Sequence, residues 1–270
     1  MSRLSRAFGG RKALVTYITA GDPDMAVTAD RILCLDASGA DVIELGVPFS
    51  DPQADGPVIQ AAGQRALRRG ATLAGILDLA AGLKGKIGAP LVLMGYYNPI
   101  LNYGEERFAR DAAESGLSGV IVPDLPYDEG ELLYGALERR GVDAVLMATP
   151  NAASDRLVEV GRRSRGFLYC VSLLGVTGTG KALHGDLEAY MARVRETTDL
   201  PLALGFGIDG PEKARLCASL ADGVVVGSAL VRLAETCQGD AARLLEETRR
   251  MVAELREALD GLQMAESPQG

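Results

Sequence analysis

Short, almost uninterrupted apolar stretches recur along the chain and alternate with amphipathic stretches of helical length. In a parallel sheet both faces of each strand are covered by helices, so such strands are apolar throughout rather than at every second position. The intervening stretches place apolar residues three and four apart, the spacing that aligns them on one face of a helix. The eight stretches that we predict to be strands are Ala13–Gly21, Asp41–Val47, Pro90–Tyr96, Gly119–Leu125, Asp143–Pro150, Gly166–Ser172, Leu200–Ile208 and Asp222–Leu230.

Eight strand–helix units in 270 residues match a closed (β/α)8 barrel, which typically needs about 250 residues. The sequence therefore predicts an α/β fold, a single TIM-barrel domain over residues 1–270 with extra helices and a flexible tail from about residue 261. The long interval between Val47 and Pro90 leaves room for one extra helix. A doubly wound open sheet is the alternative, but the regular units and the absence of a linker favour the barrel. Among the predicted helices are Met25–Ser38, Glu131–Arg140, Asp155–Arg163 and Asp186–Thr197.

Composition and charge narrow the classes of function. The formal net charge is −8 and the basic residues are scattered, which argues against a surface for nucleic acid or anionic membrane. The chain has no signal-peptide pattern, no apolar run of about 18 residues and four isolated cysteines without metal-site spacing. We therefore expect a cytoplasmic protein with free thiols. His184 is the only histidine, so no metal site is expected.

Two glycine-rich turns predict a phosphate site. One turn follows the seventh predicted strand and contains Gly205 and Gly207, and the other ends the eighth and contains Gly227 and Ser228. In TIM barrels the loops after these two strands often bind phosphate together with the N-terminus of a short helix, because backbone N–H groups and the helix dipole face the anion. The stretch GVTGTGK at 175–181 lacks P-loop spacing and is predicted to be either a mobile lid or an ordinary surface loop.

Three acids lie in the stretch ELGVPFSDPQADGP, in a region without Lys or Arg. Glu44 belongs to an apolar strand, where desolvation raises the pKa of a carboxyl group and lets it act as acid and base near neutrality. Asp55 follows a proline-stiffened loop that can return it to the barrel mouth, so the two acids can divide the proton transfers. The alternatives are a structural role for Glu44 and a turn role for Asp55, while Asp51 fits an Asx-type turn.

A phosphate site with two acids indicates proton-transfer chemistry on a phosphorylated, sugar-like substrate. None of the lysines lies in a predicted strand, which disfavours a Schiff-base aldolase. The single histidine lies in a predicted loop, which disfavours a metal-dependent aldolase and an isomerase that polarises its carbonyl with histidine. An acid–base carbon–carbon cleavage or an isomerisation remains, and residue spacing does not choose between them.

Seven segments, in order between about Leu14 and Val231, resemble the tryptophan synthase alpha subunit family. They are YITAGDPD, ELGVPFSDPQADGPVIQ, YYNPI, GVIVPDLP, GVTGTG, LALGFGI and DGVVVGSALV. The resemblance implies a retro-aldol cleavage of indole-3-glycerol phosphate to indole and glyceraldehyde 3-phosphate. It also implies that Glu44 is the general acid and base. Asp55 would hold the indole N–H and balance the positive charge that forms on the ring.

The resemblance assigns further residues and a partner. It implies no cofactor in this chain, and a pyridoxal-phosphate beta subunit in an αββα assembly. Gln53 departs from the apolar residue usual in the partner-facing loop. The alternatives are a stand-alone lyase that releases free indole, a phosphosugar isomerase, and a module that only activates its partner. The implied phosphate-binding residues are Gly178, Gly207, Gly227 and Ser228; Thr177 would position the Asp55 loop; Tyr17, Tyr96, Tyr169 and Phe206 would line the indole pocket or support the acids; Pro48 and Asp51 would meet the partner.

Overall fold

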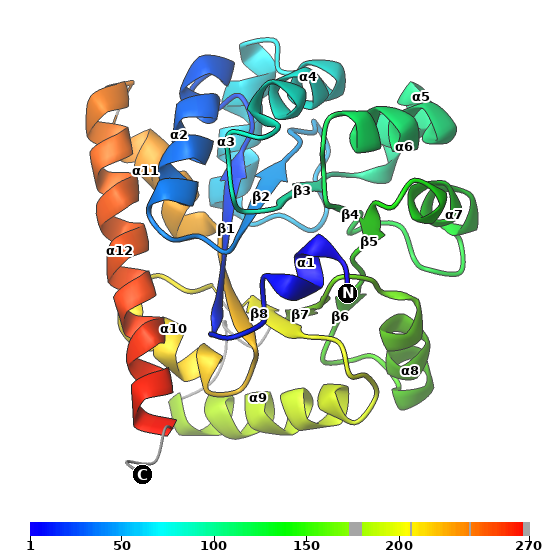
Figure 1. Cartoon of the computed structure of the whole chain (residues 1–270), viewed down its shortest axis with the longest axis vertical. Helices are drawn as coiled ribbons and strands as arrows, with labels where there is room; N and C mark the ends of the chain where they lie inside the picture. The colour runs from blue at the N-terminus through cyan, green and yellow to red at the C-terminus, as the bar shows by residue number, and fades with distance from the viewer. Residues whose placement is uncertain (173–179, 206, 238, 267–270) are drawn as a thin grey trace.

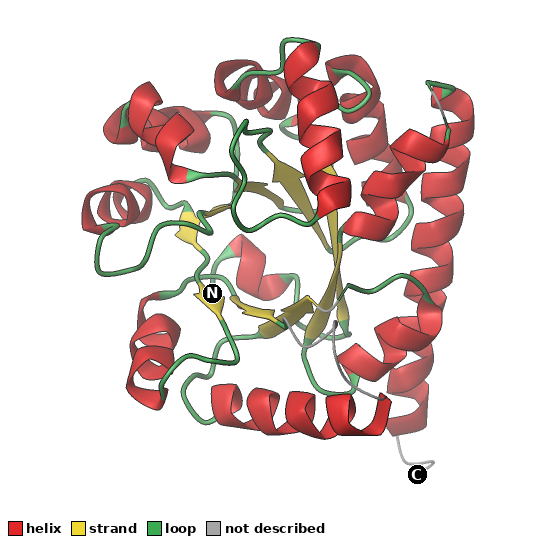
Figure 2. Ribbon diagram, turned by 180° about the vertical axis from the view of Figure 1, so that it is seen from behind, coloured by secondary structure: helices red, strands yellow, loops and turns green. Residues whose placement is uncertain are grey.

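The computed structural model describes residues 1–172, 180–205, 207–237 and 239–266. Within these residues nine short parallel strands form one sheet, with helices arranged around it (Figures 1 and 2). Each of the eight predicted stretches contains strand residues, and the α/β-barrel prediction is confirmed. The strands are β1 (Ala13–Thr19), β2 (Val42–Gly46), β3 (Leu91–Met94), β4 (Gly119–Ile121), β5 (Asp143–Ala144), β6 (Met147–Ala148), β7 (Leu168–Val171), β8 (Leu202–Gly205) and β9 (Gly223–Val226).

The fifth predicted strand closes the sheet into a barrel. It is divided into β5, which pairs with β4, and β6, which pairs with β7, and these two short strands are the ends of the strand order. Between them, the Val145 amide donates to the Val120 carbonyl at 3.0 Å, and the Leu146 carbonyl accepts from the Tyr169 amide at 3.0 Å. One continuous stretch of chain is therefore hydrogen-bonded to both neighbours.

The helices lie outside the strands. The extra helix predicted between β2 and β3 is confirmed, because two helices lie there instead of the single one of a regular strand–helix unit. Most predicted boundaries shift by a residue or two, as helix ends commonly do. The larger differences include β4 and β8, which end four and three residues earlier than predicted, at Ile121 and Gly205. Helix α9 already begins at Gly180, and Ser228 to Leu230 belong to α11 rather than to the eighth strand. The helices are α1 (Arg3–Arg6), α2 (Met25–Ala37), α3 (Pro57–Arg68), α4 (Leu73–Leu83), α5 (Tyr97–Tyr103), α6 (Glu105–Glu114), α7 (Glu131–Arg139), α8 (Ser154–Arg163), α9 (Gly180–Arg195), α10 (Pro211–Ala218), α11 (Ser228–Thr236) and α12 (Ala241–Glu266).

The flexible tail expected from about residue 261 stays a prediction, and its first residues are helical. Helix α12 continues to Glu266, because the sequence carries no glycine or proline between Leu262 and Glu266 that would end the helix earlier. Residues 267–270 lie outside the described residues. The single-domain organisation stays a prediction.

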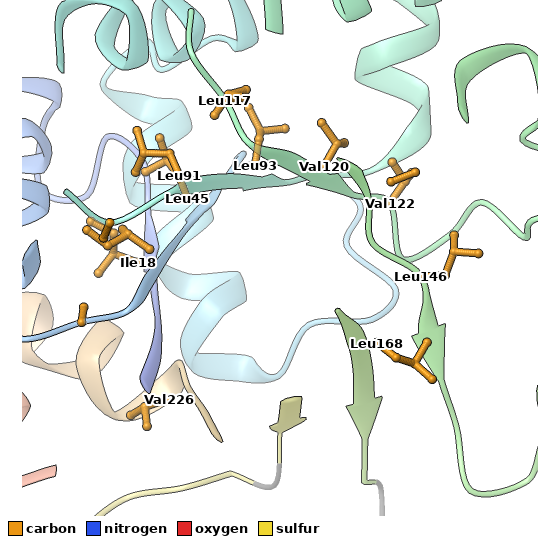
Figure 3. Close-up of a cluster of buried hydrophobic side chains, with 14 of the residues drawn as sticks. Ile18, Leu45, Leu91, Leu93, Leu117, Val120, Val122, Leu146, Leu168 and Val226 are labelled. Atoms are coloured by element: carbon orange, nitrogen blue, oxygen red, sulfur yellow. The ribbon is translucent and has the colours of Figure 1, made fainter. Parts of the chain in front are cut away.

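Successive strand residues point alternately into the barrel and out towards the helices. The outward set includes Ile18, Leu45 and Leu93, which point away from the barrel centre in Figure 3. The inward set includes Val42 and Val92. Both sets are apolar, so apolar and polar residues do not alternate along a strand. This explains the uninterrupted apolar stretches in the sequence.

Helix α1 closes the N-terminal end of the barrel and lies at the centre of the ring in Figure 1. Leu4 has no exposed surface and packs so tightly that a Cβ added to Gly119 would lie 2.6 Å from its Cδ1 atom. The rings of Phe8 and Phe167 have centroids 5.1 Å apart. With this end filled, the C-terminal ends of the strands are the open face, where barrel enzymes hold their active sites.

Candidate active site

Glu44 is fully buried in β2, on the inward-facing side of the strand. Tyr17 of β1 and Val92 of β3 are its partners in the parallel register. Among the described residues, neither carboxyl oxygen has a hydrogen-bond partner. Burial, followed by the charge of Asp55, raises the pKa of Glu44 to about 8. At neutral pH this carboxyl group therefore holds a proton that it can donate.

Asp55 lies in the loop between β2 and α3, half-buried and two residues before Pro57 begins the helix. Tyr96 holds this loop, because its hydroxyl accepts a hydrogen bond from the Ala54 amide at 2.9 Å and its ring stacks on Phe49 with centroids 5.3 Å apart. Burial raises the pKa of Asp55 above its ordinary value, and a hydrogen bond with Tyr96 offsets part of that rise. Asp55 is therefore the more acidic of the two carboxyls, in keeping with its greater exposure.

A cavity of about 480 Å³ opens at this face of the barrel, and we call it the central cavity. Asp55, Tyr17 and Tyr169 line it. Glu44 has no exposed surface and lies beside Tyr17 in the parallel register of β1 and β2, so it lies next to this wall of the cavity. The volume suits a small organic ligand. Its remaining lining residues are Ala54, Gly56, Pro57, Val58, Ile59, Met94, Met147, Val171, Ser172, Gly205, Gly207, Val225, Gly227, Ser228 and Arg232.

Two glycine turns and the start of a helix meet at the central cavity. Gly227 precedes the first residue of α11, Ser228, and both line the cavity with Gly207. Gly207 has a φ of +55°, a left-handed conformation that suits glycine. Strands β8 and β9 are paired, so the two turns adjoin. The free N–H groups at the start of α11 and its dipole therefore face the same space.

The structure brings together most of the predicted site residues but not all of them. The central cavity is lined by Tyr17, Tyr169, Gly207, Gly227 and Ser228. Tyr96 does not line the cavity and instead supports the Asp55 loop. Thr177, Gly178 and Phe206 lie outside the described residues, and so does most of the predicted lid. Of the predicted partner-facing residues, Asp51 and Gln53 are exposed and Pro48 is buried.

Sequence reasoning missed Met94, Met147 and Arg232 as cavity residues. The two methionines stand within uninterrupted apolar stretches, where every residue is apolar. They could be identified as cavity residues only by knowing which alternate positions of each strand face into the barrel. Arg232 follows Ser228 by four residues, which places both on one face of a helix. That signal became readable only when α11 was seen to begin at Ser228.

The fold and the cavity define the class of protein: an α/β-barrel enzyme whose cavity, at the C-terminal ends of the strands, is lined by Asp55 and by the glycine turns that precede α11. A family model described as tryptophan synthase alpha chain matches residues 5–262. The chain belongs to this family. It therefore has the function of a tryptophan synthase alpha chain, a lyase of tryptophan biosynthesis. Family membership assigns no cofactor to this chain and pyridoxal phosphate to the beta subunit.

Individual relatives and solved structures agree over nearly the whole chain. The tryptophan synthase alpha chain of Petrotoga mobilis is 48% identical over 95% of this chain and 99% of its own length. That of Geobacter sp. (strain M21) is 50% identical over 96% and 98%. The structure is similar to tryptophan synthase subunit alpha from Legionella pneumophila, with a TM-score of 0.88 and 35% identity over 97% and 99% of the two chains. A tryptophan synthase from M. tuberculosis gives a TM-score of 0.85 and 34% identity over 96% and 99%.

Three further features concern the described residues. No three or more of their His, Cys, Asp and Glu side chains are grouped as a metal ion would require. No helix among them is long and apolar enough to cross a membrane. All four cysteines are free and buried.

Proposed function

We propose that Glu44 and Asp55 together carry out the retro-aldol cleavage of indole-3-glycerol phosphate in the central cavity. The observation that carries the proposal is the raised pKa of Glu44, about 8, in a site that also holds the more acidic Asp55. Glu44 therefore holds a proton that it can donate at neutral pH, and half-buried Asp55 offers a second carboxyl group in the same site. The reaction needs both, because a ring carbon must gain a proton while the resulting positive charge is balanced.

In the proposed sequence, Glu44 donates its proton to C3 of the indole ring. Asp55 accepts a hydrogen bond from the ring N–H and balances the positive charge that spreads onto that nitrogen. The Glu44 carboxylate then removes the proton of the hydroxyl next to the ring. The bond between C3 and the side chain breaks, its electron pair returns to the ring, and an aldehyde forms. Glu44 ends the cycle protonated, as it began.

The rest of the cavity positions the substrate. We propose that backbone N–H groups at Gly207, Gly227 and Ser228 hold the phosphate, with Gly178 predicted to join them and Thr177 predicted to position the Asp55 loop. The apolar wall of Tyr17, Met94, Met147 and Tyr169 would receive the indole ring, with Phe206 still a prediction. Because Glu44 has no exposed surface, we expect its side chain to rotate into the cavity when substrate binds.

We also propose that the chain passes indole to a beta subunit within an αββα assembly. Structures described as tryptophan synthase are among its neighbours, and the loop between β2 and α3 exposes Asp51 and Gln53 for contact. Buried Pro48 would act by fixing the shape of this loop. A stand-alone lyase remains the alternative, since polar Gln53 weakens an apolar contact. A cytoplasmic location stays a prediction.

The test is an indole-release assay on the purified chain, with and without its beta subunit. Wild-type protein is expected to release indole, faster with the partner. Glu44→Gln should lose at least about 10²-fold in kcat, because it removes the general acid and base. Asp55→Asn should lose a similar factor, because a neutral amide cannot balance the ring charge.

Asp51→Asn, an exposed acid in the same loop, is the matched control and should release indole normally without the partner. Indole release by Glu44→Gln near the wild-type rate would contradict the proposed chemistry. An identical rate with and without the beta subunit would favour the stand-alone lyase. No release by wild type under either condition would favour a phosphosugar isomerase.

A further inference from the structure

Arg232 is the only lysine or arginine among the described residues that line the central cavity. It lies on α11, one turn after Ser228, and Ser228, Gly227 and Gly207 line the same cavity. Leu230 and Val231 are buried on the other sides of this helix. The geometry of α11 therefore turns Arg232 and Ser228 towards the same space, since residues four apart share a helix face.

The Arg232 side chain forms no hydrogen bond or ion pair with any other residue that the structure describes. The acid nearest to it along α11 is Glu235, three residues later. Glu235 lies instead in a separate cavity of about 340 Å³ at the rim of the barrel, lined also by Arg65, Arg68 and Arg69. A hydrogen bond with Asp22, and to a smaller extent the charge of Glu235, raises the pKa of Arg65. The Arg232 guanidinium is thus an exposed cation at the cavity, without a partner among the described residues.

The negative charge that a bound phosphate brings into the central cavity exceeds the positive charge that the backbone offers there. A substrate phosphate brings about two negative charges at pH 7 into a site that already holds Asp55. Backbone N–H groups and the start of a helix supply only about half a positive charge. A guanidinium supplies a full charge and a planar fork of donors that matches phosphate oxygens.

We propose that Arg232 binds the substrate phosphate, completing a site otherwise made of backbone N–H groups, and that it sets the preference for phosphorylated over unphosphorylated ligands. This inference rests on the proposed function, which places the phosphate at the start of α11. Arg232 is a specificity-determining residue here and takes no part in the proton transfers. Its loss should therefore weaken binding without slowing the chemical step.

The experiment compares wild type with Arg232→Gln, Arg232→Lys and Arg69→Gln. Arg69→Gln is the matched control, because it removes one exposed positive charge at the rim cavity and leaves the central cavity intact. Calorimetric titration with glycerol 3-phosphate measures binding directly, and steady-state kinetics give KM and kcat for indole-3-glycerol phosphate. Titration with glycerol serves as the unphosphorylated reference.

Arg232→Gln is expected to weaken glycerol 3-phosphate binding and raise KM by about 10-fold, with kcat within about twofold of wild type. Arg232→Lys should keep most of the affinity, since it retains the charge, and Arg69→Gln should match wild type. Unchanged binding of glycerol 3-phosphate by Arg232→Gln would overturn the proposal, and so would an equal loss in Arg69→Gln. If wild type binds glycerol 3-phosphate but releases no indole, the proposed function fails while the role of Arg232 is still decided by the titration.

Discussion

At the scale of single residues, the burial of Glu44 raises its pKa for proton transfer but lowers the stability of the fold. Glu44 is completely buried and neither of its oxygens has a hydrogen-bond partner among the described residues, which is unfavourable for a carboxylate. The sequence predicted Glu44 and Asp55 as the catalytic acids, because one acid lies in an apolar strand and the other follows a proline-stiffened loop. It could not predict Met94 or Arg232, whose roles depend on strand parity and on where α11 begins.

The raised pKa of Glu44 predicts a pH-dependent cost in stability. The ordinary value is 4.5 and the folded value about 8, so between these pH values the folded state keeps a proton that the unfolded state has released. Stability due to this group is complete below pH 4.5 and is lost as pH rises towards 8. Glu44→Gln has no such proton. Its free energy of unfolding should exceed that of wild type by roughly 5 kcal/mol at pH 9 and differ little at pH 4.

Urea unfolding at pH 4, 7 and 9 measures this difference. Asp51→Asn is the control, because Asp51 is exposed and its replacement should leave the pH dependence unchanged. Curves of stability against pH that run parallel for Glu44→Gln and wild type would show that Glu44 is not buried as a neutral acid.

At the scale of elements, the strands were predictable and their exact pairing was not. Apolar runs covered by helices on both sides are visible in sequence, but the division of Asp143–Pro150 into β5 and β6 follows from closing the sheet. Helix α1 was missed for another reason. It has only four residues, too few to show a helical period, and its burial depends on glycines distant in the chain, Gly119 and Gly166.

Helix α1 should matter for stability and not for catalysis. Leu4 fills the N-terminal end of the barrel, so Leu4→Ala leaves a cavity and should lower the free energy of unfolding by roughly 2–5 kcal/mol. The kcat of the folded variant should stay within about twofold of wild type, because the active site lies at the opposite end of the strands. Denaturant unfolding and indole release check the two parts. Leu132→Ala, at a side chain that is 75% exposed, should cost less than about 0.5 kcal/mol.

At the scale of the whole molecule, the barrel is fastened by a charge cluster that joins segments far apart in sequence. Asp41, just before β2, accepts a hydrogen bond from the Leu14 amide at 2.8 Å and forms ion pairs at 2.7 Å with both Arg11 and Arg256. Arg256 belongs to α12 and also donates to the Lys12 carbonyl at 2.9 Å. Partners 215 residues apart cannot be inferred from local patterns, although each charge is visible in the sequence.

The two arginines of this cluster should differ strongly in what they contribute. The Arg256 side chain is only 9% exposed, whereas that of Arg11 is 41% exposed. Arg256→Met leaves Asp41 poorly compensated and the Lys12 carbonyl without this donor, so it should lower the free energy of unfolding by about 3 kcal/mol. Arg11→Met removes a solvated pair and should cost less than about 1 kcal/mol.

The kcat for indole release should be unchanged in both variants. Asp41 precedes β2 at the N-terminal end of the barrel, whereas Asp55 follows the C-terminal end of that strand. Urea unfolding of the two variants side by side decides the matter, and equal losses would mean that the contact with α12 does not fasten the barrel.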